Sequence, residues 1–279
     1  MPELPEVETV VAQLRPHLVG RRILAADVLW PRTLAAPDRT SFIERLLGRQ
    51  ITGLSRRGKY LLFELDSDDA LIVHLRMTGR LEIVERDSPL REGPHARAWF
   101  DLSGGECLVF TDARKFGRIW LTRDLGEVLG ALGPEPLDWE FDAARLAARI
   151  RRRRVAVKAL LLNQAVVAGI GNIYADEALF LAGIHPLRPG LSLSDDEIER
   201  LHAAIHQVLR EAISQQGTTL RDYRPPYGLE GAYQNQLRVY QQTDLPCPRC
   251  GTPIQRIRVT QRSTHFCPQC QPDPTKFTV

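Results

Sequence analysis

Long apolar runs are absent from this sequence, and no stretch approaches the roughly 20 residues that a membrane-spanning helix needs. The first six residues are acidic and proline-rich, whereas a secretory signal begins with basic and then apolar residues. A large excess of charge of one sign is also lacking, because 34 acidic residues offset 37 basic ones and leave a net charge of +3. We therefore expect an intracellular protein, and the overall charge does not by itself identify a partner.

Cysteine is rare too, and its distribution is uneven. Four of the five cysteines lie near the C-terminus, as Cys247-Pro-Arg-Cys250 and, after a spacer of sixteen residues, Cys267-Pro-Gln-Cys270. Each pair can present two thiolates from a tight turn, and the spacer fits a β-hairpin. This spacing is typical of one structural zinc ion with four sulfur ligands, and a pair of disulfides is the alternative. We expect Cys107, alone in an apolar segment, to be a buried small hydrophobe.

The chain of 279 residues is near the upper limit for one hydrophobic core, so two modules, or two and a small appendage, are expected. Residues 5–18 have apolar positions at helical spacing, and Pro16 should end or kink this helix. Residues 103–105, Ser-Gly-Gly, are typical of a hairpin turn. Strands are expected at 23–30, 60–65, 71–75, 81–84, 98–102, 107–111 and 118–121.

The second half of the chain has a helical pattern. Residues 133–136, Gly-Pro-Glu-Pro, indicate a linker. Helices are expected after it at 142–153, 155–164, 173–182 and 194–215. The predicted fold class is α+β, with an N-terminal helix and an antiparallel β-sandwich, then a helical domain and a β-hairpin zinc finger. The predicted domains are residues 1–132, 133–235 and 236–279.

Basic side chains are clustered although the total charge is balanced. Residues 56–59 contain three bases, residues 151–154 are all arginine, and the last 33 residues hold five bases against one acid. Phosphate binding requires such local patches, although any single patch is more often a solvated surface. Arg262 lies at the expected tip of the zinc-finger hairpin between hydroxyl side chains, where it is well placed to bind phosphates.

The segment from Ala168 to Glu177 indicates a helix end, a turn at two glycines and a new helix that Asn172 caps. Backbone N–H groups at such a helix start suit an anion, although a turn of this kind is more often purely structural.

The N-terminus offers a nucleophile. If Met1 is removed, Pro2 carries a free secondary amine, and α-amino groups have pKa values of about 8, so a useful fraction is unprotonated near neutrality. Such an amine can attack an electrophilic carbon and form an iminium, and Glu3 beside it could move protons. Pro2 and Pro5 could equally form a simple helix entry, and the residues alone leave both interpretations open.

Together these motifs resemble the formamidopyrimidine-DNA glycosylase family along nearly the whole chain. The opening Pro-Glu-Leu-Pro-Glu-Val-Glu favours the branch for oxidised purines, because the endonuclease VIII branch usually begins Pro-Glu-Gly-Pro-Glu. The resemblance rests on Pro2 to Glu8, Arg57-Gly-Lys59-Tyr60, His74-Leu-Arg-Met77-Thr-Gly79, Asp112-Ala-Arg114-Lys115-Phe116-Gly117, Gly169 to Glu177, Thr219-Leu-Arg-Asp-Tyr223 and the four-cysteine finger.

The resemblance implies a reaction at the N-terminus. Pro2 would attack C1′ of the damaged nucleotide, expel the base and leave a Schiff base, and β- and then δ-elimination would cut the strand on both sides of the sugar. Glu3 would be the acid/base partner and Glu6 a supporting carboxylate. Lys59 would contact the phosphate beside the lesion and assist catalysis. The loop that closes over the flipped purine aligns with 218–227, which includes Thr218, Thr219 and Tyr223.

The resemblance also implies contacts with duplex DNA. A base inside a duplex must be flipped out at a cost of a few kcal/mol, and side chains inserted into the vacated stack recover part of it. Met77, Arg114 and Phe116 match the family's void-filling residues, and Arg114 would pair with the orphaned cytosine. Core packing is the alternative for Met77 and Phe116. The other DNA-binding positions implied by the resemblance, on the sandwich, the helix–two-turn–helix domain and the finger, are His74, Lys158, Asn172 and Arg262.

Three positions depart from the family pattern. Lys115 stands where many relatives have a second arginine, and Gln241-Gln242 replaces the usual Gly-Arg before the finger. Gln216-Gly217-Thr218 replaces the common Gly-Gly-Ser ahead of the lesion loop. These changes concern DNA contacts and lesion preference rather than the chemistry.

We therefore expect a monomeric cytoplasmic enzyme that acts on 8-oxoguanine opposite cytosine and on formamidopyrimidines in double-stranded DNA, and that holds one structural zinc ion. An endonuclease VIII-like enzyme for oxidised pyrimidines is the nearest alternative. A catalytically silent DNA-binding relative is another, although intact Pro2, Glu3 and Lys59 argue against it. A zinc-ribbon protein with RNA or protein partners does not explain the N-terminal motif.

Overall fold

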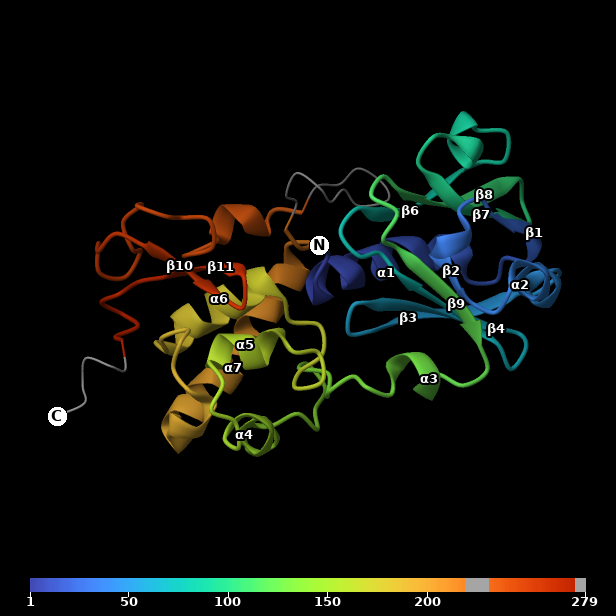
Figure 1. Cartoon of the computed structure of the whole chain (residues 1–279). Helices are drawn as coiled ribbons and strands as arrows, with labels where there is room; N and C mark the ends of the chain where they lie inside the picture. Colours follow the sequence, from blue (N-terminus) through green and yellow to red (C-terminus); the bar gives the residue numbers. More distant parts are fainter. Residues whose placement is uncertain (219–230, 274–279) are drawn as a thin grey trace. The chain divides into compact units, whose positions relative to one another are not determined.

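The computed structural model describes residues 1–218 and 231–273, and by its contacts the chain divides into two units (Figure 1). The N-terminal unit comprises Met1–Gly130 and Gln216–Ala232, and the C-terminal unit comprises Ala131–Gln215 and the residues from Tyr233 onward. The described residues 216–218 and 231–232 therefore belong to the same unit as the first residues of the chain. Within the described ranges, no helix combines the length and apolar character that crossing a membrane requires.

Among the described residues, the N-terminal unit has two β-sheets that share one core with helix α1 (Leu4–Leu18). One sheet is antiparallel, in the order β1-β7-β8-β6, and the other has the order β2-β9-β5-β4-β3 with β2 and β9 parallel. The predicted sandwich is thereby confirmed, apart from this parallel edge pair. The strands are β1 Ile23–Val28, β2 Leu34–Ala36, β3 Ile51–Arg57, β4 Tyr60–Leu65, β5 Ala70–His74, β6 Gly79–Glu85, β7 Ala96–Leu102, β8 Glu106–Asp112 and β9 Arg118–Thr122.

Apolar periodicity places these elements around the core. In β4, Leu61, Phe63 and Leu65 are buried, while the residues that alternate with them are partly or fully exposed, as expected for a strand with one face on the core. One face of α1 is buried at helical spacing, and Arg15 Nε donates to the carbonyl of Leu54 at 2.8 Å, which fixes the helix along β3. Cys107 is buried in β8 as predicted, and burial raises the pKa of its thiol to about 12.

The structure differs locally from what the sequence predicts. Helix α1 runs through Pro16 to Leu18, because Pro16 lies on the exposed face, where water can satisfy the carbonyl that loses its donor, and buried Leu18 anchors the last turn. Strand β3 was missed, since its glycine and polar residues hide the apolar pattern and its pairing with β4 decides the structure. Two short helices of this unit were also missed, α2 (Arg39–Leu46) and α3 (Gly126–Leu129).

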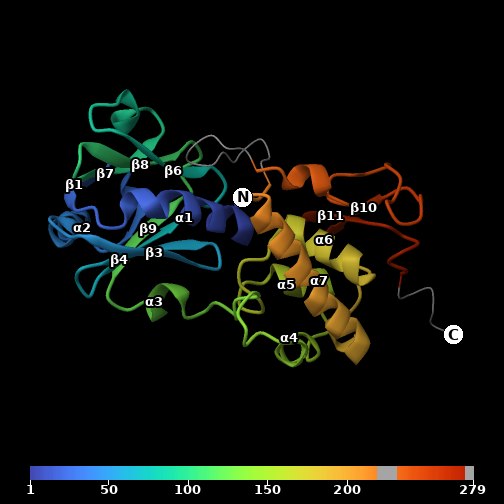
Figure 2. The same ribbon diagram turned by 180° about the vertical axis from the view of Figure 1, so that it is seen from behind.

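The C-terminal unit has helices close to the four predicted ones, with α6 and α7 packed together and the finger hairpin against α6 (Figure 2). Gly183, at φ +70°, ends α6 in the left-handed region. A capping box between Ser194 and Glu197 starts α7. The elements are α4 Ala143–Ile150, α5 Val157–Leu162, α6 Asn172–Ala182, α7 Asp195–Ser214, β10 Gln255–Val259 and β11 Arg262–Phe266.

Candidate active site and nucleic-acid interface

The sheet register brings several turns to one end of the N-terminal unit. Tyr60 at the start of β4 pairs with His74 at the end of β5, and Gly79 at the start of β6 pairs with Asp112 at the end of β8. The turns that follow or join these strand ends are 58–59, 75–78 and 113–117. Both views of the ribbon place the start of α1 at this same end (Figures 1 and 2).

The first residues of the chain belong to the helix start. Glu3 is the N-cap of α1, and its side chain accepts the N–H of Glu6, while Glu6 Oε2 accepts the N–H of Glu3 at 2.8 Å. This reciprocal capping box satisfies two donors that a helix start otherwise leaves without partners. Pro2, Glu3 and Glu6 are all buried, so the predicted nucleophile and both predicted carboxylates are held together at one helix end.

Glu6 also joins the helix start to a segment that is distant in the sequence. Its Oε1 accepts the N–H of Thr218, 212 residues later, at 2.8 Å. Gly217 permits this approach, because it has φ +78° and an added Cβ would lie 2.9 Å from Glu6 Oε1. Thr218 therefore lies beside the predicted catalytic residues, and one carboxylate serves both the helix cap and this segment.

A bridge joins the start of the predicted lesion loop to residues that follow it in the sequence. Thr218 pairs with Ala232 in an antiparallel bridge. Gly231 lies so close to the backbone of Gly217 that an added Cβ would be 2.3 Å from its carbonyl oxygen. The base of the loop is thereby fixed next to Glu6. The other predicted loop residues, Thr219 and Tyr223, lie outside the described residues.

Lys59 follows Gly58, which has φ +56°, in the turn between β3 and β4, and its side chain is buried. Helix α1 is tied to this hairpin, because Glu8 pairs with Arg56 at 2.9 Å and Arg56 donates to the carbonyl of Gly58 at 3.3 Å. The helix that carries Glu3 at its start therefore also holds the turn that carries Lys59.

His74 is buried at the end of β5, with its ring centre 4.5 Å from that of Tyr60 in an edge-to-face contact. Its Nδ1 accepts the N–H of Arg76 at 3.0 Å, which leaves Nε2 to carry the proton. Burial, together with the positive charges of Arg76 and Lys59, lowers the pKa of His74 to about 3. The ring is therefore neutral at physiological pH and holds the turn that leads to Met77.

This shift predicts an acid sensitivity of folding. Because the pKa of His74 is lower in the folded protein than its ordinary value of 6.5, the unfolded chain binds a proton that the folded one does not. Stability is therefore lost as pH falls from 6.5 towards 3. We expect His74 to account for a loss of about 2 kcal/mol in unfolding free energy between about pH 7.5 and about pH 5.

Urea unfolding of wild type and His74→Gln at both pH values measures this loss. His95→Gln removes an exposed histidine and should keep the wild-type loss; the same loss in His74→Gln contradicts the assignment.

One buried carboxylate organises the two turns that carry Met77, Arg114 and Phe116. Asp112 accepts the hydroxyl of Thr78 and the N–H groups of Arg114 at 3.1 Å, Phe116 at 2.7 Å and Gly117 at 2.7 Å. Sequence reasoning included Asp112 in a motif but gave it no role. An aspartate at a strand end before a turn is the local signal that could have identified it.

The side chains on these turns are available for contact. Phe116 is 52% exposed and Arg114 is exposed, with the guanidinium carbon 5.2 Å from the Phe116 ring centre. Core packing therefore does not explain Phe116, whereas Met77 is partly buried. Lys115, at φ +61°, places its ammonium 4.0 Å from the ring centre of Trp30, a cation–π contact.

We expect Asp112→Asn to impair these turns. The donors from Thr78, Arg114, Phe116 and Gly117 share the two carboxylate oxygens of Asp112, whereas the amide of asparagine has only one acceptor oxygen. Hydrogen bonds to a buried charged group contribute about 1.5–3 kcal/mol each. Unfolding free energy should fall by about 2 kcal/mol, and excision from duplex DNA should slow by about tenfold. Cleavage at an abasic site in single-stranded DNA should change less, because there is no stack to fill.

Asp124→Asn, which alters an exposed turn of the same unit, is the control for Asp112→Asn. Equal effects of the two variants would contradict the role of Asp112.

The four cysteines of the predicted zinc site meet in the structure. Their Sγ atoms all lie within 4.8 Å of one another, and none forms a disulfide. Zinc–sulfur bonds of about 2.3 Å place sulfurs about 3.8 Å apart, and the distances are 3.9 Å for Cys247–Cys270 and 3.5 Å for Cys250–Cys267. The N–H groups of Arg249 and Cys270 point at two of the sulfurs, each at 3.4 Å. These residues fit one structural zinc ion, and a complete set of four sulfur ligands leaves no open position for catalysis.

The finger is docked on α6. Arg249 donates to the carbonyls of Phe180 and Leu181, each at 3.0 Å, at the C-terminal end of that helix. Phe180, Val239 and Ile254 are buried in a small core with cysteines of the finger. Arg249 therefore stabilises a helix end in the protein.

Arg262 and Asn172 lie close together in the C-terminal unit. Arg262 is exposed directly after a two-residue turn in which Thr260 and Gln261 have positive φ, so it lies at the hairpin tip as predicted. Asn172 is the first residue of α6 and not its cap, which corrects the prediction, because Gly171 occupies the N-cap position. Its Nδ2 donates to the carbonyl of Ser263 at 2.9 Å, so the helix start is joined to the hairpin.

Lys158 is placed differently from the prediction. Its side chain has 0% exposure, and its Nζ lies 2.6 Å from Asp176 Oδ1. The ammonium has three N–H donors, and Asp176, the Thr264 hydroxyl and the Ser263 carbonyl face them, so the structure indicates a buried cation in place of the expected phosphate contact. The cause is long-range, since the carboxylate comes from α6 and nothing in the sequence around Lys158 indicates it.

Comparisons with known proteins agree with this geometry. Residues 1–119 match the formamidopyrimidine-DNA glycosylase N-terminal domain, 132–224 match the formamidopyrimidine-DNA glycosylase H2TH domain, and 244–272 match the zinc finger found in FPG and IleRS. The formamidopyrimidine-DNA glycosylase of Chloroflexus aggregans is 50% identical over 274 residues, which cover 97% of this chain and 98% of that protein.

Solved structures give the same result. A mutant Lactococcus lactis Fpg in complex with Fapy-dG-containing DNA is 39% identical, with a TM-score of 0.90 and coverage of 98% of this chain and 100% of that chain. The wild-type Lactococcus lactis Fpg in complex with DNA containing an oxidised pyrimidine has the same identity, coverage and TM-score. On this identity and coverage, the chain belongs to the formamidopyrimidine-DNA glycosylase family.

Proposed function

We propose that this protein is a bifunctional DNA glycosylase and AP lyase that excises 8-oxoguanine and formamidopyrimidines from double-stranded DNA in base excision repair. The observation that carries the proposal is the linked set at the start of α1. Pro2 adjoins Glu3, Glu3 shares a capping box with Glu6, and Glu6 holds Thr218 at the base of the predicted lesion loop. The nucleophile, the proton carrier and the loop base are thus positioned by one another. Family membership supports the same activity.

The proposed chemistry begins once Met1 has been removed. The lone pair of the Pro2 nitrogen forms a bond to C1′ while the C1′–N bond breaks, and the base leaves with that electron pair and takes up a proton. Pro2 then loses its proton, the C1′–O4′ bond opens with protonation of O4′, and an iminium remains. Removal of a C2′ proton expels the 3′ phosphate, a second elimination expels the 5′ phosphate, and hydrolysis frees Pro2. Glu3 is the residue placed to carry these protons.

The turns at the same end of the sandwich support the DNA-binding part. Lys59 and His74 are held on paired strands, and we propose that they contact phosphates beside the lesion. Exposed Phe116 and Arg114, with Met77, would fill the place of the flipped nucleotide. Asn172 and Arg262 would contact phosphates from the C-terminal unit. We further propose a monomer that works in the cytoplasm, associated with the nucleoid through DNA.

A lesion panel tests the proposed substrate. Untagged protein is incubated with duplexes that carry 8-oxoguanine opposite cytosine, dihydrouracil, an abasic site or no lesion. We expect cleavage at 8-oxoguanine to be about tenfold or more faster than at dihydrouracil, with phosphate at both ends of the gap. A preference for dihydrouracil would instead support the endonuclease VIII-like alternative. That alternative is included because Lactococcus lactis Fpg has been solved in complex with DNA that contains an oxidised pyrimidine. Cleavage of no substrate would indicate a catalytically silent DNA-binding relative.

A further inference from the structure

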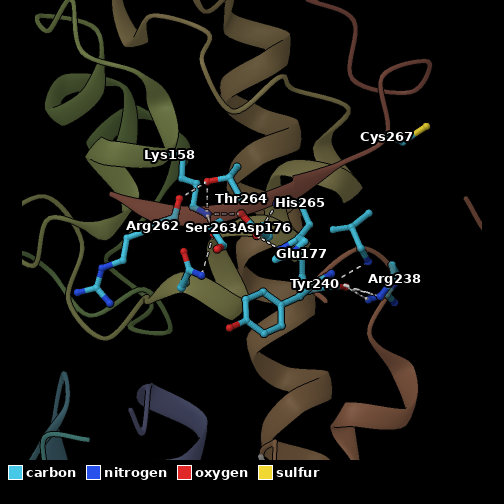
Figure 3. Close-up of polar contacts among 12 residues, drawn as sticks. Lys158, Asp176, Glu177, Arg238, Tyr240, Arg262, Ser263, Thr264, His265 and Cys267 are labelled. Carbon is cyan, nitrogen blue, oxygen red and sulfur yellow. Dashed lines mark hydrogen bonds and ion pairs between the residues drawn. The ribbon is translucent and has the colours of Figure 1, made fainter. Parts of the chain in front are cut away.

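Two adjacent acids on α6 are fully buried against the finger (Figure 3). Asp176 and Glu177 have 1% and 0% exposure on a helix that is apolar on nearly all sides. Buried carboxylates are costly unless other groups satisfy them, so their partners indicate what they do.

Glu177 binds the backbone that leads into the finger. Its carboxylate accepts the N–H groups of Arg238, Val239 and Tyr240 at distances of 2.9 to 3.1 Å. Burial raises the pKa of Glu177, and the three N–H groups oppose that rise. This acid therefore fixes the entry of the chain into the finger.

Asp176 binds the other side of the finger, the hairpin. Its Oδ2 accepts the N–H of His265 at 2.9 Å and lies 3.1 Å from the Nδ1 of the same residue. Its Oδ1 faces Lys158 Nζ at 2.6 Å. An ion pair between α5 and α6 is thus joined to strand β11.

The Lys158 ammonium continues this network to the hairpin tip. Nζ donates to the Thr264 hydroxyl at 2.7 Å and to the Ser263 carbonyl at 3.0 Å. The Thr264 hydroxyl donates to the carbonyl of Arg262 at 3.2 Å, and the Ser263 carbonyl also accepts from Asn172. Figure 3 shows these groups converging from α5, α6 and β11. Arg262 and Asn172, the proposed phosphate-binding residues of this unit, therefore each share a hydrogen bond with an oxygen that Lys158 also binds.

We propose that Lys158 and Asp176 form a positioning pair that sets the hairpin tip against the start of α6, so that Arg262 and Asn172 can bind one DNA backbone together. The pair acts on DNA affinity without contacting a phosphate. The inference rests on the proposed DNA roles of Arg262 and Asn172. A buried ion pair is a poor source of stability, because desolvation offsets its attraction, whereas its hydrogen bonds fix geometry in specific directions.

The test uses Lys158→Met, Asp176→Asn and the double variant, each with Arg262 intact and with Arg262→Ala. Affinity for a duplex with a tetrahydrofuran abasic analogue is measured at several salt concentrations, and zinc content is measured on each protein. Arg188→Met is the control, because it breaks a partly exposed ion pair with Glu197 in the same unit. Its affinity should stay within about twofold of wild type.

We expect each single change of the pair to lower affinity about tenfold or more, since it leaves a buried charge without its partner. The double variant should stay about tenfold weaker than wild type, and not weaker by the product of the two single losses, because both changes break the same contacts to the hairpin. Arg262→Ala should itself lower DNA affinity, and adding Lys158→Met to it should lower the affinity by less than about threefold further. If a single variant does not fold or retain zinc, the double variant is compared with Arg262 intact and with Arg262→Ala, which still tests whether loss of the pair matters only when Arg262 is present.

Direct phosphate binding by Lys158 predicts different results. Loss of Lys158 would then add fully to loss of Arg262 and lower the salt slope by about one further unit. That outcome overturns the positioning pair while the proposed DNA role of Arg262 stands. If Arg262→Ala leaves affinity and salt slope unchanged, the proposed role of Arg262 fails, and the inference fails with it.

Discussion

An N-terminal extension that keeps Pro2 in a peptide bond should lower the single-turnover rate of cleavage at 8-oxoguanine by about a thousandfold or more. In a peptide bond the proline nitrogen shares its lone pair with a carbonyl and is no longer a nucleophile. In the proposed mechanism only Pro2 forms the covalent bond to C1′, so its loss is not compensated. The rate is measured with enzyme in excess over a duplex that carries 8-oxoguanine opposite cytosine.

The control is the same protein after proteolytic removal of the extension to leave Pro2 first. Its rate should return to that of the untagged enzyme, and an equal extension at the C-terminus should have little effect. DNA affinity of the blocked protein is measured in parallel, because Pro2 is buried at the start of α1 and an extension could disturb the site. Full cleavage by a protein that remains blocked would exclude Pro2 as the nucleophile.

Loss of zinc should weaken binding to damaged duplex by about a hundredfold or more, since a structural zinc site contributes much of the folding energy of a small finger. The core that docks the finger on α6 contains Cys247 and Cys267 themselves, so it does not survive without the metal. The position of Arg262 at the tip would be lost with the hairpin, and so would the hydrogen bond from Asn172 at the start of α6 to the Ser263 carbonyl. Cys267→Ser, or zinc removal with a thiol reagent and a chelator, tests this by fluorescence anisotropy.

The chemistry should persist when zinc is removed. The predicted catalytic residues belong to the N-terminal unit, which has its own core. Borohydride trapping with free 2-deoxyribose 5-phosphate, which needs no duplex binding, should stay within about twofold of the zinc-loaded protein. Unchanged duplex affinity in the zinc-free protein would contradict the structural role of the metal, and loss of trapping would contradict its separation from the chemistry.

Features that depend on neighbouring residues could be predicted from the sequence. The cysteine spacing predicted the finger and its hairpin, because two ligands in each turn and a spacer of fixed length determine the site. The Ser103-Gly104-Gly105 turn was confirmed for the same reason, since both glycines have positive φ between paired strands. The opening sequence up to Glu8 and the motif at Gly169 identified the family.

Features that depend on distant partners could not be predicted in this way. Lys158 was expected to contact a DNA phosphate, and only the fold shows that Asp176 and the hairpin enclose it. The link from Glu6 to Thr218 joins positions 212 residues apart, and no local pattern indicates it. The acids of α6 did carry an unused signal, because two adjacent carboxylates in an otherwise apolar helix must find buried partners.

Borohydride trapping of the untagged protein, followed by mapping of the adduct, tests the central claim most directly. The substrates are duplexes with 8-oxoguanine opposite cytosine, with dihydrouracil, with an abasic site and with no lesion. We expect a covalent adduct on the 8-oxoguanine strand that maps to the Pro2 nitrogen, and no adduct on undamaged DNA. An adduct at another residue, or none on any lesion or abasic site from a protein whose Pro2 is free, would contradict it.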